Sequence, residues 1–107
     1  MSDVKSFNSK KIRTVWVSKT RKRYFVIRDV VFALTDTKDV KSYIKGMRAR
    51  DKALDKSWGK VTTALKVETN GGVQLINCAD KKNLLRIIEA IPNPIKLETF
   101  KKWLAKL

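Results

Sequence analysis

Two groups of closely spaced cations are the residues in this sequence best suited to chemistry, and that chemistry is the binding of phosphate. Four of the five residues at 19–23 are basic, and a second group recurs every three or four residues from 38 to 48. Lysine and arginine at such spacing can neutralise neighbouring phosphates of a nucleic acid. The first group contains Lys19, Arg21, Lys22 and Arg23, and the second contains Lys38, Lys41, Lys45 and Arg48.

Both groups also have a purely structural interpretation, because turns are polar and an amphipathic helix needs a solvated face. Four like charges within five residues repel one another, however, and a turn has no structural need for them. We therefore predict that both groups bind DNA. Lysines dominate, which favours contacts that position the backbone. Arg21 and Arg48 are the candidates to read a base edge, because a guanidinium group matches the acceptors of guanine.

No arrangement of residues predicts catalysis. The sequence has no histidine, which removes the commonest general base and metal ligand. Its one cysteine, Cys78, cannot build a zinc cluster and is expected to be a buried small hydrophobe. Lys66 and Glu68 faintly resemble a nuclease motif, but the nearest acidic partner, Asp55, is distant in sequence. We expect no enzyme, no catalytic residue, no metal site and no cofactor.

Size and charge narrow the class of partner. The chain has 107 residues, enough for one domain, and 43% of them are hydrophobic, enough for a core. Its net charge of +15 favours a polyanionic partner, with nucleic acid ahead of an anionic membrane surface or an acidic protein. Residues 1–28 hold nine positive charges and one negative charge, so the excess is concentrated near the N-terminus.

Localisation follows from the lone cysteine and the hydropathy. One cysteine excludes an intramolecular disulfide and fits a reducing compartment. The sequence lacks an apolar run long enough to span a membrane, and its N-terminal residues lack the apolar stretch of a signal peptide. We therefore expect a cytoplasmic or nuclear protein.

Two β-hairpins are expected. The segments 12–17 and 24–27 are rich in β-branched and aromatic residues, which places the first basic group at a hairpin tip. The segments 61–69 and 73–78 flank Asn70-Gly71-Gly72, whose residues tolerate the positive φ of tight turns.

The second basic group falls on an expected amphipathic helix over 36–52, with Asp36 as its N-cap and Asp39 in its first turn. Its apolar face contains Val40, Tyr43, Ile44 and Met47.

Three further helices complete the expected pattern. A short one starts at Asp29, one spans 79–91, and the last opens at Pro94. A loop is expected at 51–60, anchored to the core by Trp58.

These elements predict an α+β fold of two β-hairpins with about four helices in a single compact domain. Residues 1–11 are expected to form a flexible basic N-terminus, and 12–107 to form the domain.

The sequence also resembles a known family. IRTVW at 12–16, YFVIRDVVFALTD at 24–36, RIIEAIP at 86–92 and FKKWLA at 100–105 resemble, in this order, the Bro-N domain. That domain is the N-terminal domain of baculovirus BRO proteins and of phage or prophage antirepressor-like proteins. The resemblance spans roughly 12–107 and implies a small α+β domain that binds DNA in transcription regulation, near the nucleoid or in the nucleus of an infected cell. The chain departs from the family with DKKNLLRII at 80–88, where a form like NTEGLFRII is usual.

Two alternative functions stay open. The first is a protein-interaction module whose basic surface meets a repressor or another acidic partner, with Trp58 or the last helix as its hot spot. The second is binding of RNA or single-stranded nucleic acid on aromatic side chains. The candidate stacking residues are Trp16, Tyr24, Phe25 and Trp58, all of which are also expected in the core.

Overall fold

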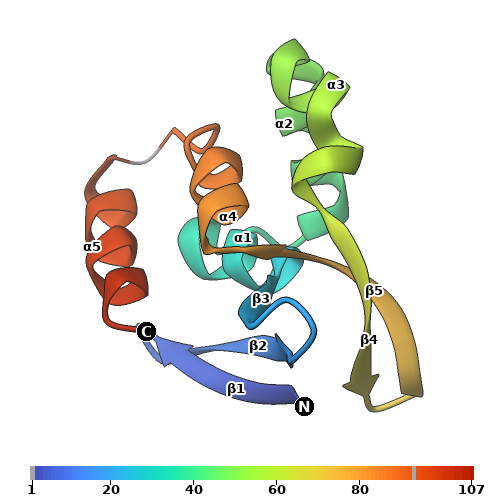
Figure 1. Ribbon diagram of the computed structural model, residues 1–107. Helices are drawn as coiled ribbons and strands as arrows, with labels where there is room; N and C mark the ends of the chain where they lie inside the picture. Colours follow the sequence, from blue (N-terminus) through green and yellow to red (C-terminus); the bar gives the residue numbers. More distant parts are fainter. Residues whose placement is uncertain (1, 93) are drawn as a thin grey trace.

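A five-stranded antiparallel sheet is the base of the fold, as Figure 1 shows. The computed structural model describes residues 2–92 and 94–107. The strand order is β1-β2-β3-β5-β4, so the two hairpins are joined through β3 and β5. The strands are β1 (Ser2–Phe7), β2 (Lys10–Val17), β3 (Lys22–Val26), β4 (Thr63–Thr69) and β5 (Gly72–Asp80).

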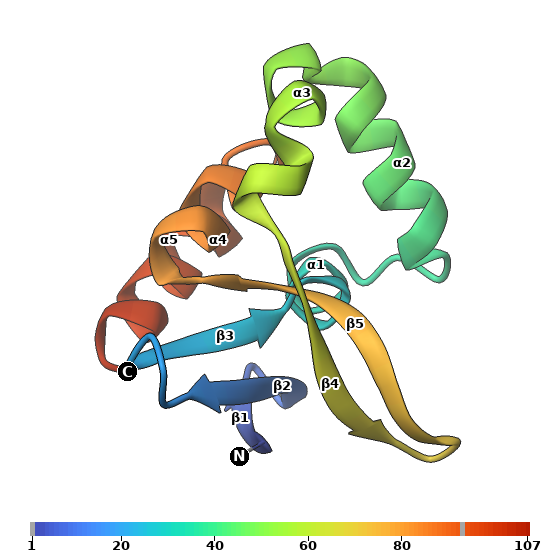
Figure 2. The same ribbon diagram turned by 45° about the vertical axis from the view of Figure 1, so that its right-hand side comes forward.

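Five helices accompany the sheet in the described ranges. They are α1 (Ile27–Thr35), α2 (Val40–Arg50), α3 (Lys52–Val61), α4 (Lys81–Ile88) and α5 (Pro94–Ala105). Helices α1, α4 and α5 pack on the sheet, whereas α2 and α3 form a pair that projects from the rest, with the β4–β5 hairpin extending in another direction (Figures 1 and 2). The predicted α+β class and both predicted hairpins are confirmed, with five strands and five helices.

The main core lies between the sheet and the helices. Phe25 and Ile12 of the strands are fully buried. Leu34, Leu84 and Phe100 of the helices belong to the same buried cluster. Alternate strand residues point to opposite faces, so a second, smaller cluster forms on the other side of the curled sheet. It contains Val15, Val26, Val67, Ile76 and Cys78.

Cys78 is a buried small hydrophobe, as predicted. Burial disfavours the thiolate and raises the pKa of the Cys78 thiol to about 11. Such a thiol is a poor nucleophile at neutral pH.

The N-terminal segment belongs to the fold, so the prediction of a flexible N-terminus is wrong for residues 2–11. All six residues of β1 pair with β2. Phe7 is 2% exposed, and its ring lies 5.1 Å from that of Phe100 in an edge-on contact. The indole Nε1 of Trp103 donates a hydrogen bond to the carbonyl of Ser6 at 2.8 Å. These contacts fix β1 against α5.

The boundary between α1 and α2 differs from the prediction. Asp36 ends α1 in a left-handed conformation with φ 54°, and its N–H donates to the Phe32 carbonyl at 2.8 Å. Asp39 caps α2 instead, because its carboxylate accepts the N–H of Ser42 at 3.1 Å. Lys38 therefore precedes the basic helix.

Asp29 does not cap α1, which begins two residues earlier at Ile27. Its carboxylate accepts the backbone N–H of Arg13 at 3.0 Å and pairs with the guanidinium of the same residue at 2.8 Å. The Asp29 carboxylate thus accepts a backbone hydrogen bond of β2 at the point where the pairing of β2 with β3 has ended.

The expected loop at 51–60 is helix α3. Asp51 caps it by accepting the N–H of Leu54 at 2.9 Å, and it also pairs with Arg86 of α4 at 3.2 Å. Leu54 is fully buried and Trp58 is 9% exposed, so the predicted role of Trp58 as an anchor is confirmed.

Asp36 gives the fold a testable dependence on pH. Its carboxylate pairs with Lys96 Nζ at 2.8 Å and Lys10 Nζ at 3.2 Å, and these contacts, that of Lys96 first, lower the pKa of Asp36 below its usual value of 3.8. A lowered folded-state pKa stabilises the fold at pH values above the unfolded-state pKa, and this stabilisation is lost as pH falls through the folded-state pKa.

We expect Asp36→Asn, which tolerates the left-handed conformation, to lower the melting temperature modestly at neutral pH. The difference from the parent chain should shrink in acid. Thermal unfolding from about pH 7 to about pH 2 measures this, and a difference that is constant with pH would contradict it.

Candidate functional site

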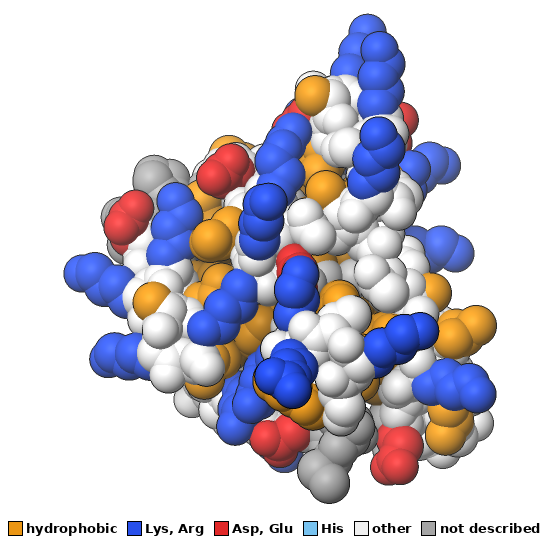
Figure 3. All heavy atoms as spheres, in the orientation of Figure 1, with side chains coloured by type: hydrophobic (Ala, Val, Ile, Leu, Met, Phe, Trp, Pro, Cys, Tyr) orange, Lys and Arg blue, Asp and Glu red, His pale blue; other side chains and the backbone are white. Residues whose placement is uncertain are grey.

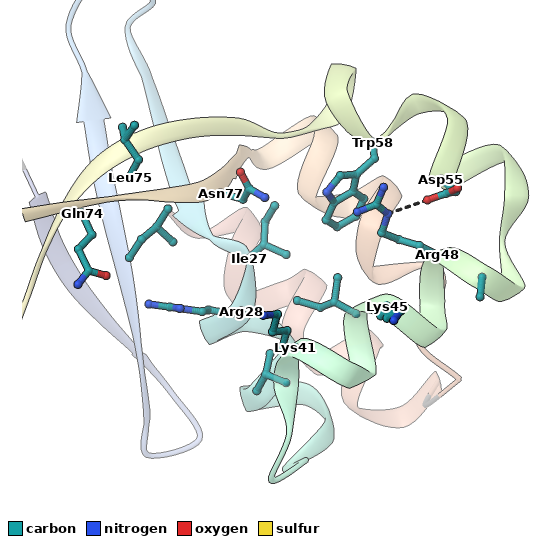
Figure 4. A pocket seen from close by; sticks show the side chains of 14 residues that line it. Ile27, Arg28, Lys41, Lys45, Arg48, Asp55, Trp58, Gln74, Leu75 and Asn77 are labelled. Atoms are coloured by element: carbon teal, nitrogen blue, oxygen red, sulfur yellow. Dashed lines mark hydrogen bonds and ion pairs between the residues drawn. The ribbon is translucent and has the colours of Figure 1, made fainter.

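A groove of about 950 Å³ separates α2 from β5 (Figure 4). Its origin lies in the sheet. β3 pairs with β5 only from Tyr24 to Val26, and the chain then turns into α1. In the described chain, β5 from Gly72 to Asn77 therefore pairs with β4 alone, and the groove lies against its other edge.

The rim of the groove is basic. Arg28 of α1 and Lys41, Lys45 and Arg48 of α2 all line it, against a single carboxylate, Asp55. The side chains of Arg28, Lys41 and Lys45 are exposed. Within residues 2–92 and 94–107, neither Arg28 nor Lys45 makes a hydrogen bond or an ion pair, so both charges are available to an anion.

Arg48 is held more firmly than the other rim cations. Its Nε donates to Asp55 Oδ1 at 2.7 Å, and its guanidinium lies 4.9 Å from the centre of the Trp58 ring. Figure 4 shows this stack at the end of the groove next to α3. A guanidinium fixed by a carboxylate and an aromatic face loses little freedom on binding. Whether Arg48 reads a base edge stays a prediction.

The floor of the groove is apolar. Ile27 lies at its centre in Figure 4, between β5 and α2. The apolar residues that line the groove are Ile27, Val40, Ile44, Ala49, Trp58, Leu75 and Ile76. The site thus combines a hydrophobic floor with cations at its mouth, a combination suited to a ligand that has both apolar and anionic groups.

The basic turn lies elsewhere. The connection between β2 and β3 is at the left of Figure 2, and α2 is at the right. None of the four turn cations lines the groove, and neither does Lys38. The structure therefore gathers Lys41, Lys45 and Arg48 at one site, and leaves the first basic group at the opposite end of β3.

Two of the turn cations are engaged within the sheet. Lys22 Nζ pairs with Asp80 of β5 at 3.3 Å, and Arg23 lies 4.0 Å from Asp3 of β1. Lys19 and Arg21 are exposed, and Arg21 has a left-handed backbone with φ 54°. The turn can thus offer an anion two cations without breaking an ion pair.

Sequence reasoning missed Arg28. Its segment was interpreted as the end of a strand leading into a helix at Asp29, whereas Arg28 lies in the first turn of α1 with an exposed side chain. The signal was a lone arginine after the apolar run 24–27. The strand order that brings this residue beside β5 is not visible in the sequence.

The wider surface is strongly basic as well. Figure 3 shows Lys and Arg side chains over the whole of the face in view, above helices and strands alike, with few acidic side chains between them. Among the described residues, no three His, Cys, Asp or Glu side chains are grouped so that they could hold a metal ion. In the same ranges, every helix is too short or too polar to cross a membrane.

Searches of protein-family models, curated proteins and solved structures give no match to this chain. The resemblance to the Bro-N domain stays a prediction that rests on the segments quoted above.

Proposed function

We propose that this chain binds duplex DNA and that the groove rim is its main contact. One observation carries the proposal: Arg28, Lys41, Lys45 and Arg48 gather at one groove that holds a single carboxylate, on a chain of net charge +15. Phosphate contacts supply most of the sequence-independent affinity of proteins for DNA. An exposed helix such as α2 also has the width that the major groove admits.

The turn supplies a second and separate contact through Lys19 and Arg21. Its other two cations already neutralise Asp80 and Asp3, so they add less. The Bro-N resemblance supports the same function, that of a DNA-binding domain in an antirepressor-like regulator of transcription. Such a protein acts where DNA is, at the nucleoid or in the nucleus of an infected host cell.

Salt dependence tests this proposal on the intact chain. If about five phosphates are neutralised, the logarithm of the association constant for duplex DNA should fall against the logarithm of salt concentration with a slope of about −4 to −5. Mobility-shift titrations over a range of salt concentrations measure the slope. Absence of binding, or an affinity independent of salt, would overturn the proposal. Parallel titrations with single-stranded DNA and RNA should give weaker binding, and tighter binding to either would replace duplex DNA as the ligand.

A further inference from the structure

We propose that the groove also binds a partner protein, by taking up an extended acidic segment that adds as a strand to the free edge of β5. The surface is the groove described above, and the partner is defined by its chemistry: a stretch of about six residues in which acidic and aliphatic side chains alternate. This inference goes beyond DNA binding, because it adds the groove floor and the strand edge to the rim cations that the proposed function uses.

The first support is the edge itself. In the described chain, β5 pairs with β3 only from Cys78 to Asp80, so the edge from Gly72 to Asn77 has no strand beside it. Four consecutive residues, Gln74 to Asn77, line the groove. Successive side chains of a strand point to opposite faces, so four in a row can line one groove only if it runs along the strand edge. An open edge of this kind presents backbone N–H and C=O groups to an incoming strand.

The second support is how floor and rim alternate. Ile44 and Leu75 offer apolar contacts, while Arg28, Lys41 and Lys45 bring positive charge to the mouth. A strand lying on β5 sends alternate side chains to its two faces. Aliphatic residues on one face would meet the floor, and carboxylates on the other would meet the rim.

Other occupants fit less well. A second copy of this chain would bring its own charge of +15 to a rim that is already basic. A single-stranded nucleic acid needs exposed aromatic faces, but Trp58 is 9% exposed and is covered by Arg48. Duplex DNA can meet the rim, but it has no extended amide backbone to pair with the strand edge.

Fluorescence anisotropy with a synthetic peptide tests the proposal. The probe is a labelled peptide in which glutamate and valine alternate. It has about seven residues, which is within the usual length of a strand. Its control is the same peptide with all central amide nitrogens methylated, which keeps the charges and side chains and removes the donors. We expect the parent peptide to bind and the methylated copy to bind at least about tenfold more weakly, because several backbone hydrogen bonds are lost. Equal binding of the two peptides would overturn strand addition.

Two matched variants locate the site. Leu75 lines the groove and is 70% exposed, whereas Val73 is 62% exposed on the same strand and does not line it. Leu75→Ser should weaken peptide binding by about three- to tenfold through lost apolar contact. Val73→Ser should leave peptide binding unchanged. Equal effects of the two variants on peptide binding would overturn the location.

The two proposals fail separately. A chain that binds duplex DNA but not the peptide overturns the strand site and leaves DNA binding intact. A chain that binds the peptide but not duplex DNA overturns DNA binding and leaves the strand site intact. Circular dichroism of each variant confirms that the comparison is between folded chains.

Discussion

Replacing Arg28, Lys41 and Lys45 together with glutamine is expected to weaken duplex DNA binding by about two to three orders of magnitude near 0.1 M salt. Each phosphate contact contributes about 0.9 to the salt slope, so the loss of three contacts makes the slope shallower by about three. Near 0.1 M salt, the same loss lowers the association constant by about two to three orders of magnitude. All three side chains are exposed at the groove rim, and none lies in the core, so the fold should persist. Mobility-shift titrations at several salt concentrations measure both quantities.

A control of equal charge separates the groove from the bulk charge of the protein. Replacing Lys101, Lys102 and Lys106 in and after α5 with glutamine also takes the net charge from +15 to +12, but none of the three lines the groove. This variant should lose affinity only slightly, because exposed charges beyond about 10 Å are largely screened at this salt concentration. Equal losses in the two triple variants would show that binding is spread over the whole surface.

Phe7→Ala is expected to lower the free energy of unfolding by about 3–5 kcal/mol, as burial of a whole aromatic ring implies. The Phe7 ring is 2% exposed and meets the rings of Phe100 at 5.1 Å and Trp103 at 5.5 Å. Its loss removes the apolar contact between β1 and α5. Urea unfolding followed by circular dichroism measures the change.

Val4→Ala provides the comparison on the same strand. Val4 is 48% exposed, so its truncation should cost no more than about 0.5 kcal/mol. If Phe7→Ala proved as mild as Val4→Ala, the N-terminal segment would not be docked as the structure has it.

The elements that could be predicted are those encoded by neighbouring residues. The strand at 12–17, the turn at Asn70-Gly71 and the start of the last helix at Pro94 were all found, because branched residues, positive-φ residues and proline act locally. The error over β1 has the opposite cause. Its residues are mostly polar, and only its pairing with β2 and the burial of Phe7 make it a strand.

Helix α3 was missed although its signal was present. Leu54, Trp58 and Val61 follow the i, i+4, i+7 spacing of a helix face, and Asp51 supplies the cap. The single glycine and the many charges of 51–60 suggested a loop instead. Asp36 and Asp39 posed a different problem, because either could cap a helix. Only the left-handed conformation of Asp36 shows that it ends one helix while Asp39 begins the next.

The site was predicted only in part. Lys41, Lys45 and Arg48 were identified from their spacing on one helix face, and the structure places them at a single groove. The opposite wall could not have been found in this way. It depends on β3 lying beside β5, strands some fifty residues apart in the sequence. The turn cations lie apart from α2 because the turn precedes β3, whereas α1 and α2 follow the other end of that strand.

The switch from strand to helix at Ile27 has a consequence for engineering. The groove exists because the chain leaves the sheet there, so its length depends on a backbone boundary more than on the side chains around it. Inserting strand-forming residues before Ile27 would extend β3 along its neighbour and close the site from within, with every cation at its mouth retained. Addition of a peptide strand to β5 would thus be abolished while the charged side chains of the surface stay the same.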